Sequence, residues 1–169
     1  DHNREMVFKF NDLENKGAFV ALRIDGDKIS IDEKIKALTD ELELKKLNTT
    51  ILDVHQSTPF WIKINNLELF KQTKNNLLRG VIPPSQGKKL MQYLGNKYKY
   101  YIDWCGSLYW IEVQSKKNTK VGEIKNLIKE LGGYLTVIKT SNEYDYEETI
   151  FTVDDTRLLI SEKIKKSFD

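Results

Sequence analysis

The chain has 169 residues, of which 40% are hydrophobic, 31% are charged and 11% are aromatic. These values suit one globular domain with a core and exclude a fibrous, low-complexity or disordered chain. No apolar run approaches the roughly 20 residues that a membrane span needs. The net charge is only +2 and the charges are interspersed, whereas nucleic-acid-binding domains usually carry a basic stripe. We therefore expect neither a membrane span nor a nucleic-acid partner.

Few residues suited to metal or cofactor chemistry are present. Cys105 is the single cysteine, which excludes an internal disulfide and a multi-cysteine zinc site. The two histidines, His2 and His55, are far apart in the sequence, so we expect no metal site. The sequence also lacks the glycine-rich motifs that bind dinucleotides or nucleotide phosphates.

The first part of the chain alternates between strand and helix patterns. Residues 17–25 and 49–54 are rich in apolar and β-branched residues and predict strands. A capping box that begins at Ser30 predicts a helix between them. Thr58 and Pro59 resemble an N-cap followed by proline at the first helical position, and we expect that helix to run to about Phe70.

In the second part of the chain, prolines and glycines mark the ends of several predicted elements. Residues 75–82 predict a strand that two prolines end, and Ser85 predicts the start of a short helix that Gly95 ends. Residues 98–113 predict a hairpin around a turn at 105–107, with a loop of two or three residues. The remaining predicted elements are a helix over 121–131 ended by Gly132 and Gly133, a strand over 134–139, a short strand over 150–153 and a final helix from Asp154 to Phe168.

This order of elements predicts an α+β fold. Because the apolar residues of each predicted helix form a single stripe, we expect the helices to pack on one face of a mostly antiparallel sheet. Strands and helices alternate in ferredoxin-like βαβ repeats. No linker rich in Pro, Gly or Ser interrupts the chain, so we predict a single domain over residues 1–169.

Arg79 and a group of aromatic residues, most of them in the predicted hairpin, are the candidate residues for a site. Arg79 is the one arginine within an apolar strand, where a guanidinium needs a carboxylate, a carbonyl or an anionic ligand. The aromatic residues could form a platform for a planar ligand, or they could pack in the core and on a hairpin face. These aromatic residues are Trp61, Tyr101, Trp104, Tyr109 and Trp110.

Five motifs in chain order resemble the FAD-binding subunit of bacterial glycolate oxidase. The sequence YIDWCGSLYW (101–110) resembles its D-W-G-G-x-x-x-W stretch, and LRGVIPPS (78–85) resembles its W-R-x-x-x-P-P-S stretch. LRIDG (22–26) is similar to L-R-x-E-G, and LGGYLT (131–136) is similar to G-G-x-A-T. Residues 157–169 resemble the closing R-L-x-x-x-I-K-x-x-F-D-P.

The resemblance implies the C-terminal cap domain of an FAD-linked oxidoreductase of the vanillyl-alcohol-oxidase type. In such proteins an N-terminal domain, not present in this chain, holds FAD, and the cap covers the flavin ring. The implied substrate is a small 2-hydroxy acid such as glycolate, and the implied location is cytoplasmic, or peripheral to the inner membrane through other glycolate oxidase subunits. We expect the isolated chain to bind no flavin and to be inactive.

Chemistry and motif position together suggest a role for each candidate residue. Arg79 would contact the substrate carboxylate, Trp104 and Trp110 would wall the cavity, and Tyr101 or Tyr109 would donate hydrogen bonds. The alternative is a non-enzymatic, ferredoxin-like interaction module whose aromatic hairpin docks a partner protein. Both interpretations predict an exposed apolar patch at the hairpin.

Overall fold

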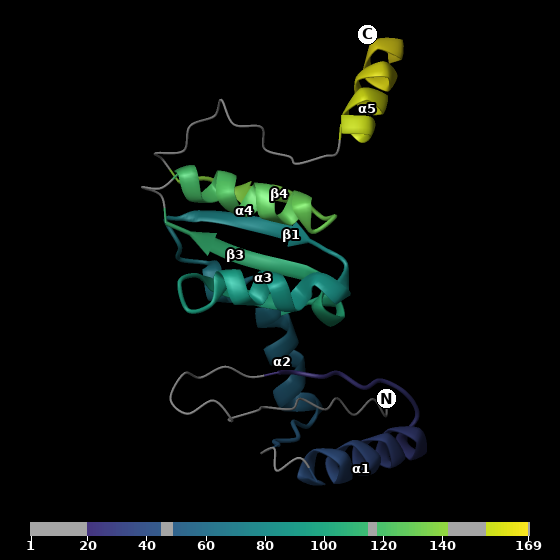
Figure 1. Ribbon diagram of the computed structural model, residues 1–169. Helices are drawn as coiled ribbons and strands as arrows, with labels where there is room; N and C mark the ends of the chain where they lie inside the picture. Colours follow the sequence, from purple (N-terminus) through teal and green to yellow (C-terminus); the bar gives the residue numbers. More distant parts are fainter. Residues whose placement is uncertain (1–19, 45–48, 115–117, 142–154, 169) are drawn as a thin grey trace. The chain divides into compact units, whose positions relative to one another are not determined.

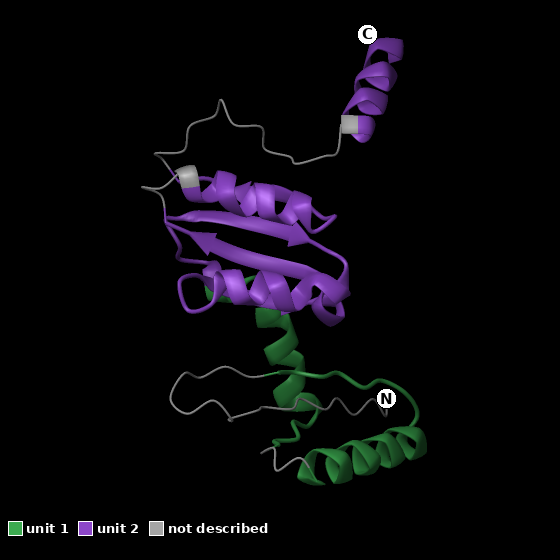
Figure 2. Ribbon diagram, in the orientation of Figure 1, with its two compact units in different colours: residues 1–69 green, residues 70–169 purple. Residues whose placement is uncertain are grey.

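The computed structural model describes residues 20–44, 49–114, 118–141 and 155–168 (Figure 1). The chain divides into two compact units, Asp1–Leu69 and Phe70–Asp169 (Figure 2). The prediction of a single domain rests on the absence of a linker rich in Pro, Gly or Ser. The boundary at Leu69 and Phe70 falls within a short 3₁₀ helix, Glu68–Phe70, so composition gives no sign of it.

The described part of the first unit is mainly helical. Its helices are α1 (Lys28–Leu44) and α2 (Val54–Asn65). The predicted cap at Ser30 is wrong, because α1 starts earlier and the Asp27 carboxylate accepts the Ser30 N–H at 3.0 Å. A small apolar cluster around Leu42 gathers Ile24, Ile35 and Leu38.

The strand predicted to end at residue 54 is also wrong, because a capping box starts α2 there. The Asp53 carboxylate accepts the Gln56 N–H at 2.9 Å, and the Gln56 side chain accepts the Asp53 N–H. Pro59 therefore lies inside α2 rather than at its start. The described residues 20–25 form no strand either, and residues 17–19 lie outside the described residues.

The second unit contains a four-stranded sheet. Its strands are β1 (Asn76–Val81), β2 (Lys99–Asp103), β3 (Leu108–Val113) and β4 (Tyr134–Lys139), in the order β2-β3-β1-β4. Every neighbouring pair is antiparallel. The helix α3 (Gly87–Leu94) connects β1 to β2, and α4 (Asn118–Glu130) connects β3 to β4. This confirms the predicted α+β fold of the ferredoxin-like β-α-β-β-α-β type.

The two connecting helices pack on one face of this sheet. Leu90 and Leu94 of α3 and Ile124 and Ile128 of α4 are buried in the same cluster as alternate strand residues. Gly80 permits a close approach of α4 to the sheet, since a Cβ there would lie 2.6 Å from Ile128 Cδ1. The other buried members of the cluster are Leu78, Ile82, Tyr109, Ile111, Val113, Val121, Leu131, Leu135 and Val137.

The hairpin between β2 and β3 has a longer loop than predicted. Asp103 pairs with Leu108, so four residues, 104–107, connect the strands instead of two or three. Three of them, Trp104 to Gly106, form a 3₁₀ turn. Trp104 therefore belongs to the loop, and the alternation of side chains along a strand does not place it on either face of the sheet.

The final helix, α5 (Asp155–Phe168), agrees with the prediction, whereas the strand predicted over 150–153 lies outside the described residues. The described side chains of α5, residues 156–168, are all exposed, and Phe168 is 87% exposed. Among the described residues, no helix is long and apolar enough to cross a membrane.

Candidate functional site

The candidate site lies on the sheet face opposite α3 and α4. The strand register aligns Arg79 with Trp110 on one side and with Thr136 on the other, and it aligns Trp110 with Tyr101. Directly paired residues of antiparallel strands point to the same face. These four residues therefore form one row across the whole sheet, which we call the Arg79 row.

Arg79 is the cation of this row. It is half-buried, and its guanidinium carbon lies 5.2 Å from the centroid of the Trp104 ring. In the part of the chain that the structure describes, no carboxylate forms an ion pair with it. A guanidinium has five N–H donors, and beside this ring contact none of them donates a hydrogen bond to another described residue. Arg79 thus retains in-plane donor capacity suited to a carboxylate or phosphate.

Glu112 is the nearest candidate for an internal partner by register, since Leu77 pairs with it one row away. Its carboxylate is engaged elsewhere. Oε1 accepts the Thr73 hydroxyl and the Asn75 amide, each at 2.6 Å, and Oε2 lies 3.9 Å from Lys99 Nζ. These contacts fix the segment before β1 against β3 and leave Glu112 as a structural group.

Trp104 is held beside Arg79 by the hairpin turn. Trp104 and Cys105 both have φ near 51°, and Gly106 has φ of 94°. Left-handed backbone is costly for residues other than glycine, so the surrounding contacts must impose it. The Asp103 carboxylate accepts the Trp104 N–H at 2.7 Å, and the Ile82 N–H donates to the Ser107 carbonyl at 2.9 Å. Trp104 itself is 56% exposed.

Nearly parallel aromatic rings continue the row beyond Trp110. The Tyr101 and Trp110 ring centroids are 6.4 Å apart, and the Phe70 and Tyr101 ring centroids are 6.1 Å apart. Burial, with a smaller contribution from Asp103, raises the pKa of Tyr101 to about 12. Its hydroxyl therefore stays protonated at neutral pH and can donate a hydrogen bond, but it cannot act as a general base there.

The structure does not bring Tyr109 into the site, which corrects its predicted role as a substrate-binding residue. Tyr109 is fully buried on the helix-covered face, because adjacent strand residues point to opposite faces. Its hydroxyl donates to the Gly87 carbonyl at 3.3 Å, and burial raises its pKa, with a further contribution from Tyr100. Gly87 is small enough to leave room for this hydroxyl.

Trp61 belongs to the first unit, and its ring makes an edge contact with the Phe60 ring there, with the ring centroids 5.2 Å apart. Sequence reasoning missed Phe70 and Thr136, which share no motif with the other site residues. Only the register and the chain path before β1 reveal them, and neither can be read from local composition.

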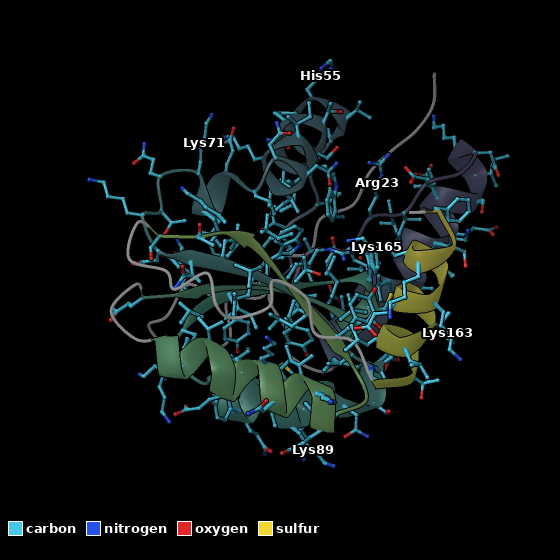
Figure 3. All side chains as sticks on the ribbon, turned by 90° about the horizontal axis from the view of Figure 1, so that it is seen from above. Arg23, His55, Lys71, Lys89, Lys163 and Lys165 are labelled. Atoms are coloured by element: carbon cyan, nitrogen blue, oxygen red, sulfur yellow. The ribbon has the colours of Figure 1, made fainter. Side chains whose placement is uncertain are left out.

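The remaining candidate groups form no second site. His55 is exposed on α2 and points outward, as Lys71 does (Figure 3). Cys105 is exposed in the hairpin turn. No cluster of three metal-ligating side chains is found within the described ranges.

If a flavin is bound, as the motif resemblance implies, the aromatic side chains of the site are suited to its ring. Trp104, Trp110 and Tyr101 offer aromatic surface, and Arg79 offers a cation with free in-plane donors. The sequence supplies no glycine-rich loop for the diphosphate of FAD, so another polypeptide segment would have to hold that part.

Comparisons of this chain with protein-family models, curated proteins and solved structures gave no significant match.

Proposed function

We propose that this chain acts as the cap domain of an FAD-linked oxidoreductase that oxidises a small 2-hydroxy acid such as glycolate, with its site on the four-stranded sheet of the second unit. A separate domain, outside these 169 residues, would hold the flavin. The five motif resemblances support this proposal, as does the placement of three of the motif residues, Arg79, Trp104 and Trp110, on or beside one row.

The observation that carries the proposal is that Arg79 is half-buried and forms no ion pair with a described carboxylate. Keeping a guanidinium half-buried is costly unless its donors are satisfied, and within the described residues no carboxylate satisfies them. A carboxylate that binds in the guanidinium plane would accept two parallel hydrogen bonds. A 2-hydroxy acid provides such a group next to its reacting carbon.

Each residue of the site has a defined part in this function. Arg79 orients the acid, Trp104 and Trp110 exclude water from it, and the protonated Tyr101 donates to an oxygen of the substrate. The flavin, when bound, supplies the hydride acceptor. The other subunits of a glycolate-oxidase-like complex are the proposed partners, and a cytoplasmic location or one peripheral to the inner membrane follows from them.

A second candidate is a protein-interaction module without catalytic activity. The 56% exposure of Trp104 favours it, because an exposed tryptophan beside an arginine is typical of an interface hot spot. This alternative requires neither a flavin nor a carboxylate. The two candidates therefore differ in what removal of the Arg79 charge should do.

The test uses the complete flavoprotein, with this chain joined to its flavin domain. Replacement of Arg79 by Met should lower kcat/KM for glycolate by about 100-fold or more, as expected when one member of a charge-assisted pair is removed. Arg79→Lys should recover part of the loss, because it keeps the charge without the planar fork. Lys99→Met is the matched control on β2, outside the Arg79 row, and should change kcat/KM little.

Two results would contradict the proposal. One is an Arg79→Met variant with unchanged kcat/KM. The other is a purified 169-residue chain that contains stoichiometric FAD, since the proposal assigns flavin binding to another domain. Loss of a protein partner in Arg79→Met, with no oxidase activity in the complete protein, would favour the interaction module.

A further inference from the structure

We infer that Glu112, beyond its structural contacts, is a positioning residue of the site and acts through Phe70 and Tyr101. Its carboxylate holds the segment Phe70–Asn75, which we call the strap, against the sheet. This inference rests on the proposed function and deepens it, because it names the residue that fixes the Tyr101 ring. The Tyr101 hydroxyl is the proposed donor to the substrate.

Glu112 lies on the same face of the sheet as the Arg79 row, in the next row. It pairs in register with Leu77 and Lys99, and it is two residues from Trp110 on β3. Residues two positions apart on a strand point to the same side of the sheet. The Glu112 side chain is only 14% exposed. A carboxylate with so little access to water needs hydrogen-bond donors, and the strap supplies two of them.

These donors belong to Thr73 and Asn75. The Thr73 hydroxyl and the Asn75 side-chain amide both donate to Glu112 Oε1, each at 2.6 Å. The Asn75 N–H donates to the Thr73 hydroxyl oxygen at 3.1 Å, and Lys139 donates to the Thr73 carbonyl. Side chains of β3 and β4 therefore hold the strap directly before β1 begins.

Thr73 connects the Glu112 carboxylate to Phe70. Its N–H donates to the Phe70 carbonyl at 3.0 Å, while its hydroxyl donates to the carboxylate. Phe70 is only 2% exposed, so its side chain is enclosed at the position that this turn gives it. A change that frees Thr73 from Glu112 therefore also frees the backbone that carries the Phe70 ring.

Lys99 adds little to this hold. Its Nζ lies 3.9 Å from Glu112 Oε2 and 5.5 Å from the centroid of the Phe70 ring, and its side chain is 50% exposed. Ion pairs in contact with water contribute little to stability. The hydrogen bonds to Glu112 Oε1, rather than the charge of Glu112, therefore hold the strap, and Lys99→Met remains a suitable control.

The Phe70 ring in turn fixes the Tyr101 ring. The two ring planes differ by 17° with centroids 6.1 Å apart, and the Tyr101 and Trp110 planes differ by 27° with centroids 6.4 Å apart. Stacked aromatic pairs gain energy beyond the area that they bury. Tyr101 thus contacts one ring of the strap and one ring of the Arg79 row. Release of the strap would remove the first of these contacts and let the Tyr101 hydroxyl move.

The first experiment records NOEs between the ring protons of Phe70 and Tyr101 in the 169-residue chain. Glu112→Leu should remove most of their intensity, because the strap loses its acceptor. Glu112→Gln should keep them, since both donors bind one oxygen and the amide retains one. Thr73→Val keeps the volume, lacks the hydroxyl and repeats the test if Glu112→Leu folds poorly. Glu123→Leu on α4 is the matched control, because its carboxylate also accepts a side-chain hydroxyl at 3.0 Å, and the NOEs should persist.

The second experiment measures kcat and KM of the complete flavoprotein for glycolate. Glu112→Leu should lower kcat by about tenfold, within the roughly 100-fold that a misplacement of about 1 Å can cost. KM should change little, because Arg79 still binds the carboxylate. In a Tyr101→Phe background the same change should lower kcat no further, because the hydroxyl that Glu112 positions is already absent. A full additional loss in that background would overturn the inference.

The two experiments distinguish failure of this inference from failure of the proposed function. Loss of the ring NOEs in Glu112→Leu, in a complete flavoprotein that oxidises no 2-hydroxy acid, would retain the hold of Glu112 on Tyr101 and refute the oxidase. Persistent NOEs in Glu112→Leu and Thr73→Val, with a normal kcat, would refute the positioning role and retain the oxidase. Lost NOEs with an unchanged kcat would also refute the positioning role.

Discussion

Arg79 and Tyr109 show that a shift of one position along a strand decides which face of the sheet a side chain points to. The sequence singled out Arg79, Tyr101, Trp104, Tyr109 and Trp110 from residue type and motif position, and four of them lie in or beside the Arg79 row. Tyr109 does not, because neighbours along a strand face opposite ways and Trp110 occupies the site face. The choice depends on register, and register depends on the hairpin loop length, which the turn residues left open.

Tyr101 carries a prediction about pH. Its pKa is raised from 10.0 to about 12 in the folded protein, so the neutral phenol is favoured by folding. The stability from this preference is fully present below pH 10 and is lost as the pH rises through 12. Tyr101→Phe should therefore lose less stability than the wild type across that interval. Urea unfolding near neutral pH and between pH 10 and 12 measures this, and parallel losses in both proteins would argue against the shift.

The elements of the second unit were predicted well because their ends are marked locally. The strand at β1 is followed by Pro83 and Pro84, α3 ends at Gly95 with φ of 48°, and α4 is followed by Gly132 with φ of 76°. Proline cannot donate a backbone hydrogen bond, and glycine readily adopts the left-handed conformation, so each can end a helix or strand by itself. Such ends can therefore be predicted from the sequence.

The strand predictions of the first unit failed for a reason that local patterns cannot show. Residues 49–53 have β-type composition, but a strand also needs a hydrogen-bonded partner, and within the described residues every paired strand belongs to β1–β4. The capping box of Asp53 and Gln56 instead begins a helix at Val54. Thr58 and Pro59 would also suit the start of a helix. The capping box at Asp53, five residues earlier, begins the helix instead.

Gly133 carries a prediction at the level of the elements it joins. A Cβ at this position would lie 2.2 Å from the Val81 carbonyl oxygen, where α4 leads into β4 beside the end of β1. Because backbone cannot yield as a side-chain end can, Gly133→Ala should destabilise the protein by about 3 kcal/mol. Chemical denaturation with a matched Gly132→Ala variant checks this. Gly132 has open space around it and should cost only about 1–2 kcal/mol, through its positive φ. Equal losses would show that the crowding at Gly133 is unimportant.

At the scale of the whole molecule, the boundary at residue 69 separates the main hydrophobic core from the first unit. Every buried member of the main cluster lies between Leu78 and Val137, whereas the first unit has a small cluster around Leu42. The absence of a linker could not reveal this division, because it reflects which residues contact each other and not which residues are present. Long-range contact patterns are the part of a fold that composition cannot supply.

This distribution of the core predicts that residues 70–141 fold without the rest of the chain. The fragment should show a single cooperative thermal transition by circular dichroism and slow amide exchange in β1 and β3, because the sheet and both covering helices are retained. A fragment of residues 20–69 is the comparison and should unfold without cooperativity. Non-cooperative melting of the 70–141 fragment would mean that the first unit completes its core.

The left-handed turn has one more consequence, which is practical. It presents Cys105, the single thiol of the chain, at the surface directly after Trp104. A maleimide dye would therefore attach at one position without any mutagenesis, within one residue of the ring that contacts Arg79. Changes in its emission would report, in real time, the arrival of an anion or of a second protein at that edge of the sheet.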